Sequence, residues 1–265
     1  MSKQEENTIV NALSYRDNIE RFYVTLQDGV RIWTWRVCND TNSQCDLAPI
    51  VLVHGACAAS VIWLHNFEEL AKNRVVYSID LPGFGLSERV DIGTDARNVE
   101  RGWATMIDEW RTSLKIEKMI LVGHSLGAYV SGAYLIRYPK RVERVFFCDP
   151  WGWGEFNPEK SAYTYDEKPF IQRVFITIII FLGTIFTPLI FLRLFGKFGV
   201  LMFKIARPEM FELLGNNAAY YMANINMIKP TGEEAFTKLH LSHGYAKHPM
   251  SQVSVLQTCR TAAIL

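Results

Sequence analysis

The chain has 265 residues, with 28 Lys and Arg against 27 Asp and Glu, and 49% of its residues are hydrophobic. This composition is typical of a globular protein and excludes a disordered chain, while the near-neutral charge argues against a general nucleic-acid binder. The five cysteines form no CxxC pair, so we expect free thiols, no metal site and no cofactor. The first residues, MSKQEENTIV, lack the pattern of a secretion signal. We therefore expect a cytoplasmic protein.

The first 150 residues alternate between patterns typical of strands and of helices. RFYVTLQDGVRIWTWRV (21–37) predicts a hairpin that turns at Asp28-Gly29. Ser60 is expected to cap a helix. Apolar runs predict buried strands at 50–55, 75–80, 119–123 and 145–149. Amphipathic patterns predict helices at 95–114 and 126–138. This alternation predicts a doubly wound, mostly parallel sheet entered through an antiparallel hairpin.

A run of 19 uncharged residues, Val174 to Leu192, has the length of a membrane-spanning helix, but a proline and a glycine interrupt it. The flanking charges between Phe170 and Pro208 are all basic. We expect a helix that lies in a membrane interface or covers a lipid site; a spanning helix and an ordinary buried helix are the alternatives. The predicted membrane or lipid contacts are Arg173, Arg193, Lys197 and Lys204.

The strongest motif is Gly123-His124-Ser125-Leu126-Gly127, a G-x-S-x-G between a predicted buried strand and a predicted helix. A nucleophile elbow requires this context, because its serine occupies a sharp turn and its hydroxyl projects above the sheet. We predict that Ser125 is a catalytic nucleophile and that Gly123, His124 and Gly127 support its geometry.

A second motif, His54-Gly55-Ala56, follows the first predicted parallel strand. Acyl transfer needs two converging backbone N–H donors that stabilise the oxyanion, one after the nucleophile and one from this earlier loop. The main chains of Leu126 and Ala56 are the candidates, with Gly55 in support. We interpret His54 as a side chain that orients the loop rather than as a base.

Several longer segments carry a further pattern. They are IDLPGFGLSE (79–88), EWR (109–111), KMILVGHSLG (118–127), YPKRVERVFFCDPWGW (138–153), TGEEAF (231–236) and GYAKHPM (244–250). Together with the two motifs they resemble the α/β-hydrolases, and more narrowly the lipid-metabolising subfamily that contains the N-acyl-phosphatidylethanolamine lysophospholipase and the lipid-droplet co-activator of triglyceride lipase. The co-activator branch carries asparagine at the position of Ser125, so at that position the chain is closer to the hydrolytic branch.

The resemblance implies an α/β-hydrolase core at 1–150, a helical cap or lipid-binding insertion at 151–250 and a divergent tail at 251–265. It implies action on phospholipids or related acyl lipids at a membrane or lipid-droplet surface, including the endoplasmic reticulum or mitochondrial surface. A lipase or a droplet-coat protein is the protein partner that it suggests.

The sequence does not identify the catalytic acid and base. In this fold both follow the last strands, and we interpret His240, His243 and His248 as surface or cap residues. Asp149 is a candidate for a displaced acid, and the family's His-x-x-x-x-Asp acyltransferase signature is absent. We expect a short or incomplete form of a longer lipid hydrolase, in which the last strands are missing and the strand at 145–148 becomes an edge.

Two functions therefore stand side by side. The first is a serine lipid hydrolase similar to lysophospholipases and N-acyl-phospholipid lipases. The second is an inactive form that binds lipid or regulates another lipase, and an acyltransferase activity is a further alternative. Ser125 favours the first function, while the unidentified acid and base favour the second.

Overall fold

The computed structural model describes residues 2–39, 47–157, 169, 189–206, 208–241, 244–252 and 262–264. The uncharged run therefore lies outside the described residues, except for its last four positions, 189–192. Arg173, His243 and residues 253–261 of the tail also lie outside them.

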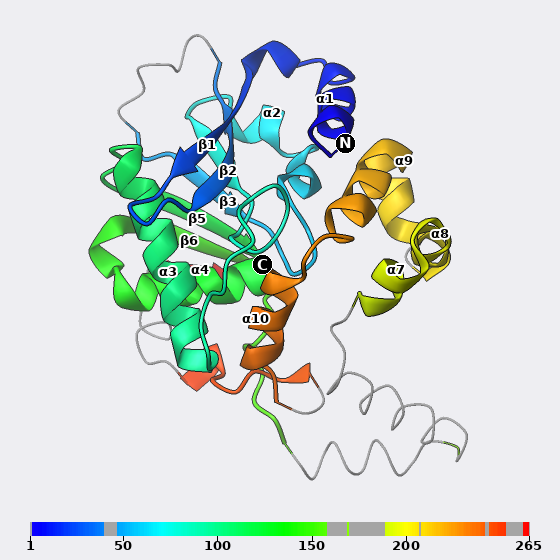
Figure 1. The fold of residues 1–265 in the computed structure, drawn as a ribbon. Coiled ribbons are helices and arrows are strands. Elements are labelled where there is room, and N and C mark those ends of the chain that lie inside the picture. The colour runs from blue at the N-terminus through cyan, green and yellow to red at the C-terminus, as the bar shows by residue number, and fades with distance from the viewer. Residues whose placement is uncertain are drawn as a thin grey trace.

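A seven-stranded sheet forms the centre of the described part of the chain, in the order β1-β2-β4-β3-β5-β6-β7 (Figure 1). β2 is antiparallel to both β1 and β4, and the remaining neighbours are parallel. This is the predicted mostly parallel sheet entered through a hairpin. The strands are β1 (Ile19–Thr25), β2 (Arg31–Val37), β3 (Ile50–Val53), β4 (Val76–Ile79), β5 (Met119–His124), β6 (Val142–Cys148) and β7 (Ala262–Ile264).

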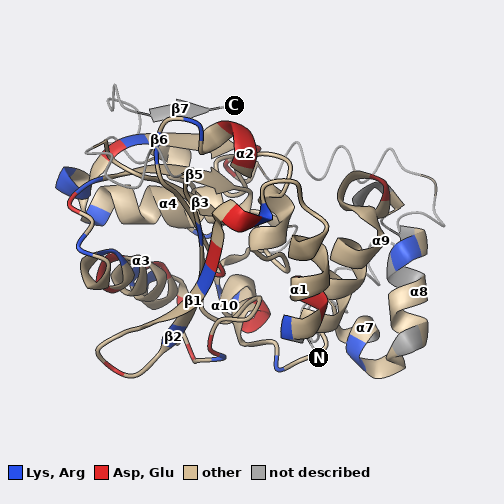
Figure 2. Cartoon of the chain, turned by 90° about the horizontal axis from the view of Figure 1, so that it is seen from above, with Lys and Arg blue, Asp and Glu red and all other residues tan. Residues whose placement is uncertain are grey.

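Helices cover both faces of the sheet (Figure 2). α3 (Ala96–Ser113) and α4 (Leu126–Arg137), the two predicted helices, lie on one face. α1 (Ser2–Asn11), α2 (Phe67–Leu70) and α9 (Pro208–Ile225) lie on the other. Each layer has its own apolar core, one around Trp103 and Trp110 and the other around Trp35 and Phe67. The two cores pack against opposite faces of the sheet.

The segment predicted to be a cap, 151–250 and called the cap below, contains α7 (Ile190–Phe195), α8 (Lys197–Ala206), α9 and α10 (Thr231–Leu239). α9 is broken at Gly215, where φ is 77°. α7 and α8 pack against α9 through Leu192, Val200 and Ala223. In the part of the chain that the structure describes, no helix has the length and apolar character needed to cross a bilayer. The division of the chain at 150 and 250 stays a prediction.

Two local expectations were wrong. Ser60 begins a single 3₁₀ turn and does not cap a helix, because its hydroxyl donates to the buried Asp80 carboxylate at 2.8 Å. The strand at 145–148 is not an edge, because β7 pairs with it in parallel, with Val145 opposite Ala262. The backbone groups that we expected to be open on β6 therefore have partners along this stretch.

Candidate active site

Ser125 occupies the turn between β5 and α4. Its backbone is left-handed, with φ 52° and ψ −116°, a conformation that is costly for a residue with a side chain. Its N–H donates to the Cys148 carbonyl at 3.1 Å, and its own carbonyl accepts from the N–H of Trp151 at 3.3 Å. These bonds hold the strained turn, and the serine side chain lies at the N-terminal end of α4, where the helix dipole favours negative charge.

The glycines of the motif are required by close backbone contacts. A Cβ on Gly127 would lie 2.2 Å from the Val53 carbonyl oxygen, and one on Gly123 would lie 2.5 Å from the Gly127 carbonyl oxygen. Neither backbone can move without disturbing the sheet. Gly127 therefore allows the start of α4 to pack directly against the end of β3, and Gly123 allows β5 to lie against the first turn of α4.

The loop after β3 lies against the elbow. A Cβ on Gly55 would lie 3.2 Å from the Cβ of Ser125, so this loop and the serine are in van der Waals contact. Among the described residues, the N–H groups of Ala56 and Leu126 have no hydrogen-bond acceptor. The structure thus brings together Ser125 and the two predicted oxyanion donors, and both donors are available to a ligand.

His54 is fully buried beside this loop. Its Nε2 accepts a hydrogen bond from the N–H of Leu81 at 2.9 Å, and its Nδ1 lies 2.7 Å from the Gly55 carbonyl oxygen. A carbonyl only accepts, so Nδ1 carries the hydrogen, and burial lowers the pKa of His54, which keeps the ring neutral. The Gly55 carbonyl and the Ala56 N–H point in opposite directions from one planar peptide group. His54 therefore helps to aim the Ala56 donor, as a loop-orienting side chain would.

His124 and Asp149 lie near each other at the ends of β5 and β6. Burial lowers the pKa of the His124 ring, and the nearby charge of Asp149 opposes that effect. The Asp149 carboxylate is exposed and forms no hydrogen bond with a histidine in the described ranges. Among the described residues, no histidine is therefore held by Asp149 through a hydrogen bond.

His240 is linked to the elbow through Trp151. The ring centroids of His240 and Trp151 lie 4.7 Å apart, and the N–H of Trp151 donates a hydrogen bond to the Ser125 carbonyl. His240 Nδ1 lies 2.8 Å from the Phe236 carbonyl oxygen, so Nδ1 carries the hydrogen in the neutral ring, and burial lowers its pKa. The remaining nitrogen, Nε2, is the basic one.

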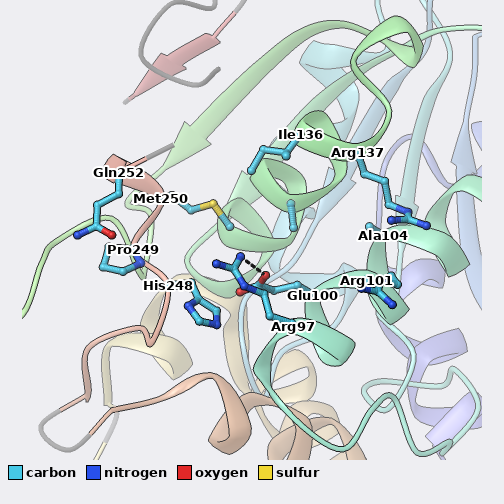
Figure 3. A pocket seen from close by; sticks show the side chains of 11 residues that line it. Arg97, Glu100, Arg101, Ala104, Ile136, Arg137, His248, Pro249, Met250 and Gln252 are labelled. Atoms are coloured by element: carbon cyan, nitrogen blue, oxygen red, sulfur yellow. Dashed lines mark hydrogen bonds and ion pairs between the residues drawn. The ribbon is translucent and has the colours of Figure 1, made fainter. Parts of the chain in front are cut away.

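His248 lies elsewhere. It lines a pocket of about 410 Å³ between α3, α4 and the segment 248–252, together with Arg97, Glu100 and Arg137 (Figure 3). Its carbonyl accepts a hydrogen bond from the Tyr129 hydroxyl at 3.0 Å. Ser125 does not line this pocket, so the pocket is separate from the candidate active site.

The predicted membrane contacts have different surroundings. The Arg193 side chain is only 12% exposed, and its guanidinium lies 2.6 Å from Glu233 Oε1, so contact with a membrane would require this ion pair to open. Lys204 is half-buried and lies over the Phe211 ring. Lys197 is the first residue of α8. The sequence could not indicate the ion pair, because 40 residues separate its partners.

Two polar residues near the site were not predicted. Asp80 is fully buried and accepts hydrogen bonds from the Ser60 N–H at 2.7 Å and the Leu86 N–H at 2.8 Å. In the sequence this residue ends the predicted strand 75–80 and belongs to the IDLPGFGLSE segment, but neither pattern marks it as part of the site. Asn226, which follows α9, donates to the Cys57 carbonyl at 2.7 Å, and no motif marks it.

Comparison with known proteins defines the class. The family model described as alpha/beta hydrolase fold matches residues 48–217, and the chain therefore belongs to the α/β-hydrolase family. The carboxylesterase CesB from Bacillus subtilis shares the fold at a TM-score of 0.59 and 16% identity, covering 99% of this chain and 77% of that one. An epoxide hydrolase, CorEH, gives a TM-score of 0.55 at 18% identity, covering 83% and 73%.

Curated relatives correspond to the two branches that the sequence resembles. The 1-acylglycerol-3-phosphate O-acyltransferase of Mus musculus is 36% identical over 236 residues, which cover 86% of this chain and 64% of the relative. The (Lyso)-N-acylphosphatidylethanolamine lipase of Homo sapiens is 32% identical over 233 residues, which cover 86% and 66%. The chain thus spans slightly less than two thirds of the length of these relatives.

Proposed function

We propose that this chain is a serine ester hydrolase that acts on acyl lipids, with Ser125 as its nucleophile. The observation that carries the proposal is the left-handed Ser125 at the elbow, in contact with Gly55 and flanked by the available N–H groups of Ala56 and Leu126. The substrate class is supported by the relatives, whose names specify an N-acylphosphatidylethanolamine lipase and an acylglycerol-phosphate acyltransferase.

The geometry supports the acyl-transfer step directly. The Ser125 hydroxyl attacks the ester carbonyl, and the N–H groups of Ala56 and Leu126 stabilise the resulting oxyanion. The alcohol departs with a proton, and water then releases the acid from the acyl-enzyme. An alcohol in place of water would make the same site an acyltransferase.

A serine hydroxyl also needs a base at neutral pH. No histidine within the described residues forms a hydrogen bond with Ser125. This observation favours a second candidate function, in which the chain binds an acyl lipid without turnover and regulates another lipase or a droplet-coat protein.

We further propose that the protein works on the cytoplasmic surface of a membrane or lipid droplet, through α7 and α8. These helices expose five large apolar side chains, and that of Ile205 is 73% exposed. Residues 189–206 contain basic residues and no acid, as the blue segments of α7 and α8 in Figure 2 illustrate. An apolar helical surface with basic residues is typical of a protein that lies on anionic lipid. The exposed apolar residues are Leu194, Phe195, Phe198, Leu201 and Ile205.

A fluorophosphonate probe tests the catalytic proposal. We expect slow labelling of the folded chain, because no described base contacts Ser125, and loss of labelling in Ser125→Ala. Rapid labelling that disappears in His240→Gln would identify that histidine as the base. A folded chain that labels no faster than the Ser125→Ala variant, yet still binds a fluorescent lysophospholipid, would refute the hydrolase and support the binding function.

A further inference from the structure

We propose that Asn226 is a positioning residue of the oxyanion loop, an inference that rests on the proposed hydrolase function. Asn226 follows α9 in the cap and is 9% exposed. Its Nδ2 donates to the Cys57 carbonyl and to the Met222 carbonyl, both at 2.7 Å. The first bond connects the cap to the residue directly after Ala56, the predicted oxyanion donor.

The Cys57 carbonyl controls the turn that presents this donor. Cys57 has φ 58°, so the loop contains a left-handed residue that is not glycine and needs external contacts to hold it. Its carbonyl belongs to the same peptide group as the Ala58 N–H, which donates to the Gly55 carbonyl at 3.3 Å. The Gly55 carbonyl in turn shares a planar peptide group with the Ala56 N–H. Asn226 therefore fixes the Cys57–Ala58 peptide group, and the Gly55–Ala56 peptide group in the same turn carries the oxyanion donor, the Ala56 N–H.

Asn226 is itself held by a buried ion pair. Its backbone carbonyl accepts a hydrogen bond from Arg193 Nη1 at 3.0 Å. The two guanidinium nitrogens of Arg193 lie 2.6 Å and 3.1 Å from the two carboxylate oxygens of Glu233, whose side chain is 3% exposed. A two-point bond between buried charges resists distortion, because either partner alone would be an uncompensated charge. The contacts that hold Asn226 thus include Arg193 of α7 and, through it, Glu233 of α10.

This placement predicts a particular kinetic effect. The oxyanion forms only in the transition state, so misdirecting the Ala56 N–H should lower kcat and leave KM unchanged. Removal of a direct oxyanion donor typically lowers kcat by about 100-fold to 1,000-fold. A lost positioning contact displaces the donor without removing it, so we expect a decrease of roughly tenfold or more.

The test compares Asn226→Ala with Asn224→Ala in the full 265-residue chain. Asn224 is a matched control, because its Nδ2 donates at 2.7 Å to Glu5 of α1 and so connects the same helix end to a different element. Asn226→Asp keeps the size of the side chain while removing its donors, and it replaces Asn226→Ala if that variant does not fold.

Two measurements are made on each variant. The first is amide hydrogen exchange of the peptide that contains residues 55–60, which needs no catalytic activity. We expect loss of Asn226 to speed exchange of the Ala58 N–H by about tenfold or more, and loss of Asn224 to leave it unchanged. The second is kcat and KM for a short-chain p-nitrophenyl ester, corrected with Ser125→Ala.

The outcomes separate the two proposals. A wild-type chain without Ser125-dependent turnover refutes the hydrolase, and the exchange measurement still decides whether Asn226 holds the loop. Equal exchange in the wild type, Asn226→Ala and Asn224→Ala overturns the positioning role. An active enzyme in which Asn226→Ala raises KM at constant kcat overturns it as well, because the defect would then lie in substrate binding.

Discussion

Replacement of Glu6 by glutamine should remove a pH dependence of folding that this carboxylate imposes near neutral pH. Glu6 lies on α1 with its side chain 1% exposed. Its Oε1 accepts hydrogen bonds from Trp33 Nε1 at 3.0 Å, Trp35 Nε1 at 3.2 Å and the Tyr221 hydroxyl at 3.1 Å. Its Oε2 accepts from Arg21 at 2.9 Å. One buried carboxyl group thus joins the N-terminal helix, the hairpin and the cap.

Burial raises the pKa of Glu6 from 4.5 to about 7, and repulsion from Asp80 acts in the same direction. The hydrogen bond from Trp33 and the charge of Arg21 oppose the shift without cancelling it. Because the pKa of Glu6 is higher in the folded state, the folded chain binds one more proton than the unfolded chain between about pH 4.5 and 7. The free energy of unfolding therefore falls as pH rises from 4.5 to 7. The shift corresponds to roughly 3 kcal/mol, most of which is lost between pH 5 and 8.

Urea unfolding of the wild type and Glu6→Gln at pH 5, 6, 7 and 8 measures this effect. The difference between their free energies of unfolding should change by roughly 2 to 3 kcal/mol across the series, with the wild type gaining stability at acid pH. The comparison cancels the pH dependence that comes from groups common to both proteins. One such group is His54, whose lowered pKa makes the fold less stable as pH falls below 6.5. Glu20→Gln, which alters an exposed carboxylate, controls for the loss of a charge.

The reasoning would be refuted if the difference in free energy of unfolding between the wild type and Glu6→Gln stayed constant within about 0.5 kcal/mol from pH 5 to 8. It would mean that Glu6 is ionised throughout and that pairing with Arg21 outweighs burial. Tryptophan fluorescence gives a local check, because Trp33 and Trp35 both donate to this carboxyl group. Their emission should titrate near pH 7 in the wild type and remain flat in Glu6→Gln.

Two further predictions concern the lipid surface and the elbow. Replacing the exposed Phe198 and Ile205 by serine should reduce co-sedimentation with anionic liposomes, as should high salt; binding that resists both salt and alkaline carbonate would instead indicate a spanning segment. Gly127→Ala should cost about 3 kcal/mol or more in thermal unfolding, since its Cβ would lie 2.2 Å from the Val53 carbonyl oxygen, whereas Gly154→Ala, with its nearest contact at 3.9 Å, should be tolerated. A Gly127→Ala protein as stable as the wild type would show that the elbow can shift.

The sheet and the elbow could be predicted because their signals are local. β3, β4 and β5 are short apolar runs. A strand inside a parallel sheet is buried on both faces, and its sequence is therefore apolar throughout. At the elbow, the close contacts of the motif glycines are with the neighbouring strand and with the motif itself. A short segment therefore contains most of the information that places Ser125.

The remaining features depend on contacts between distant segments. α1 has a polar sequence, SKQEENTIVN, and tertiary contacts hold it, among them the hydrogen bonds of Glu6 with Trp33 and Tyr221 and the burial of Ile9 and Val10. Ser60 satisfies the rules for a helix cap, but the buried Asp80 is the stronger partner and the local rule fails. β7 is three residues long, too short for a periodic pattern to reveal. In each case tertiary structure selects the conformation.

The candidate site combines both kinds of information. Local sequence produces the turn at Ser125 and places Gly55 against it. The direction of the Ala56 N–H depends on the rest of its loop, which His54 holds from one side and, as we propose, Asn226 holds from the other. An error in that direction would affect the transition state more than substrate binding. In the proposed mechanism the sheet core supplies the reacting groups, while Asn226, distant from them in sequence, supplies part of their alignment.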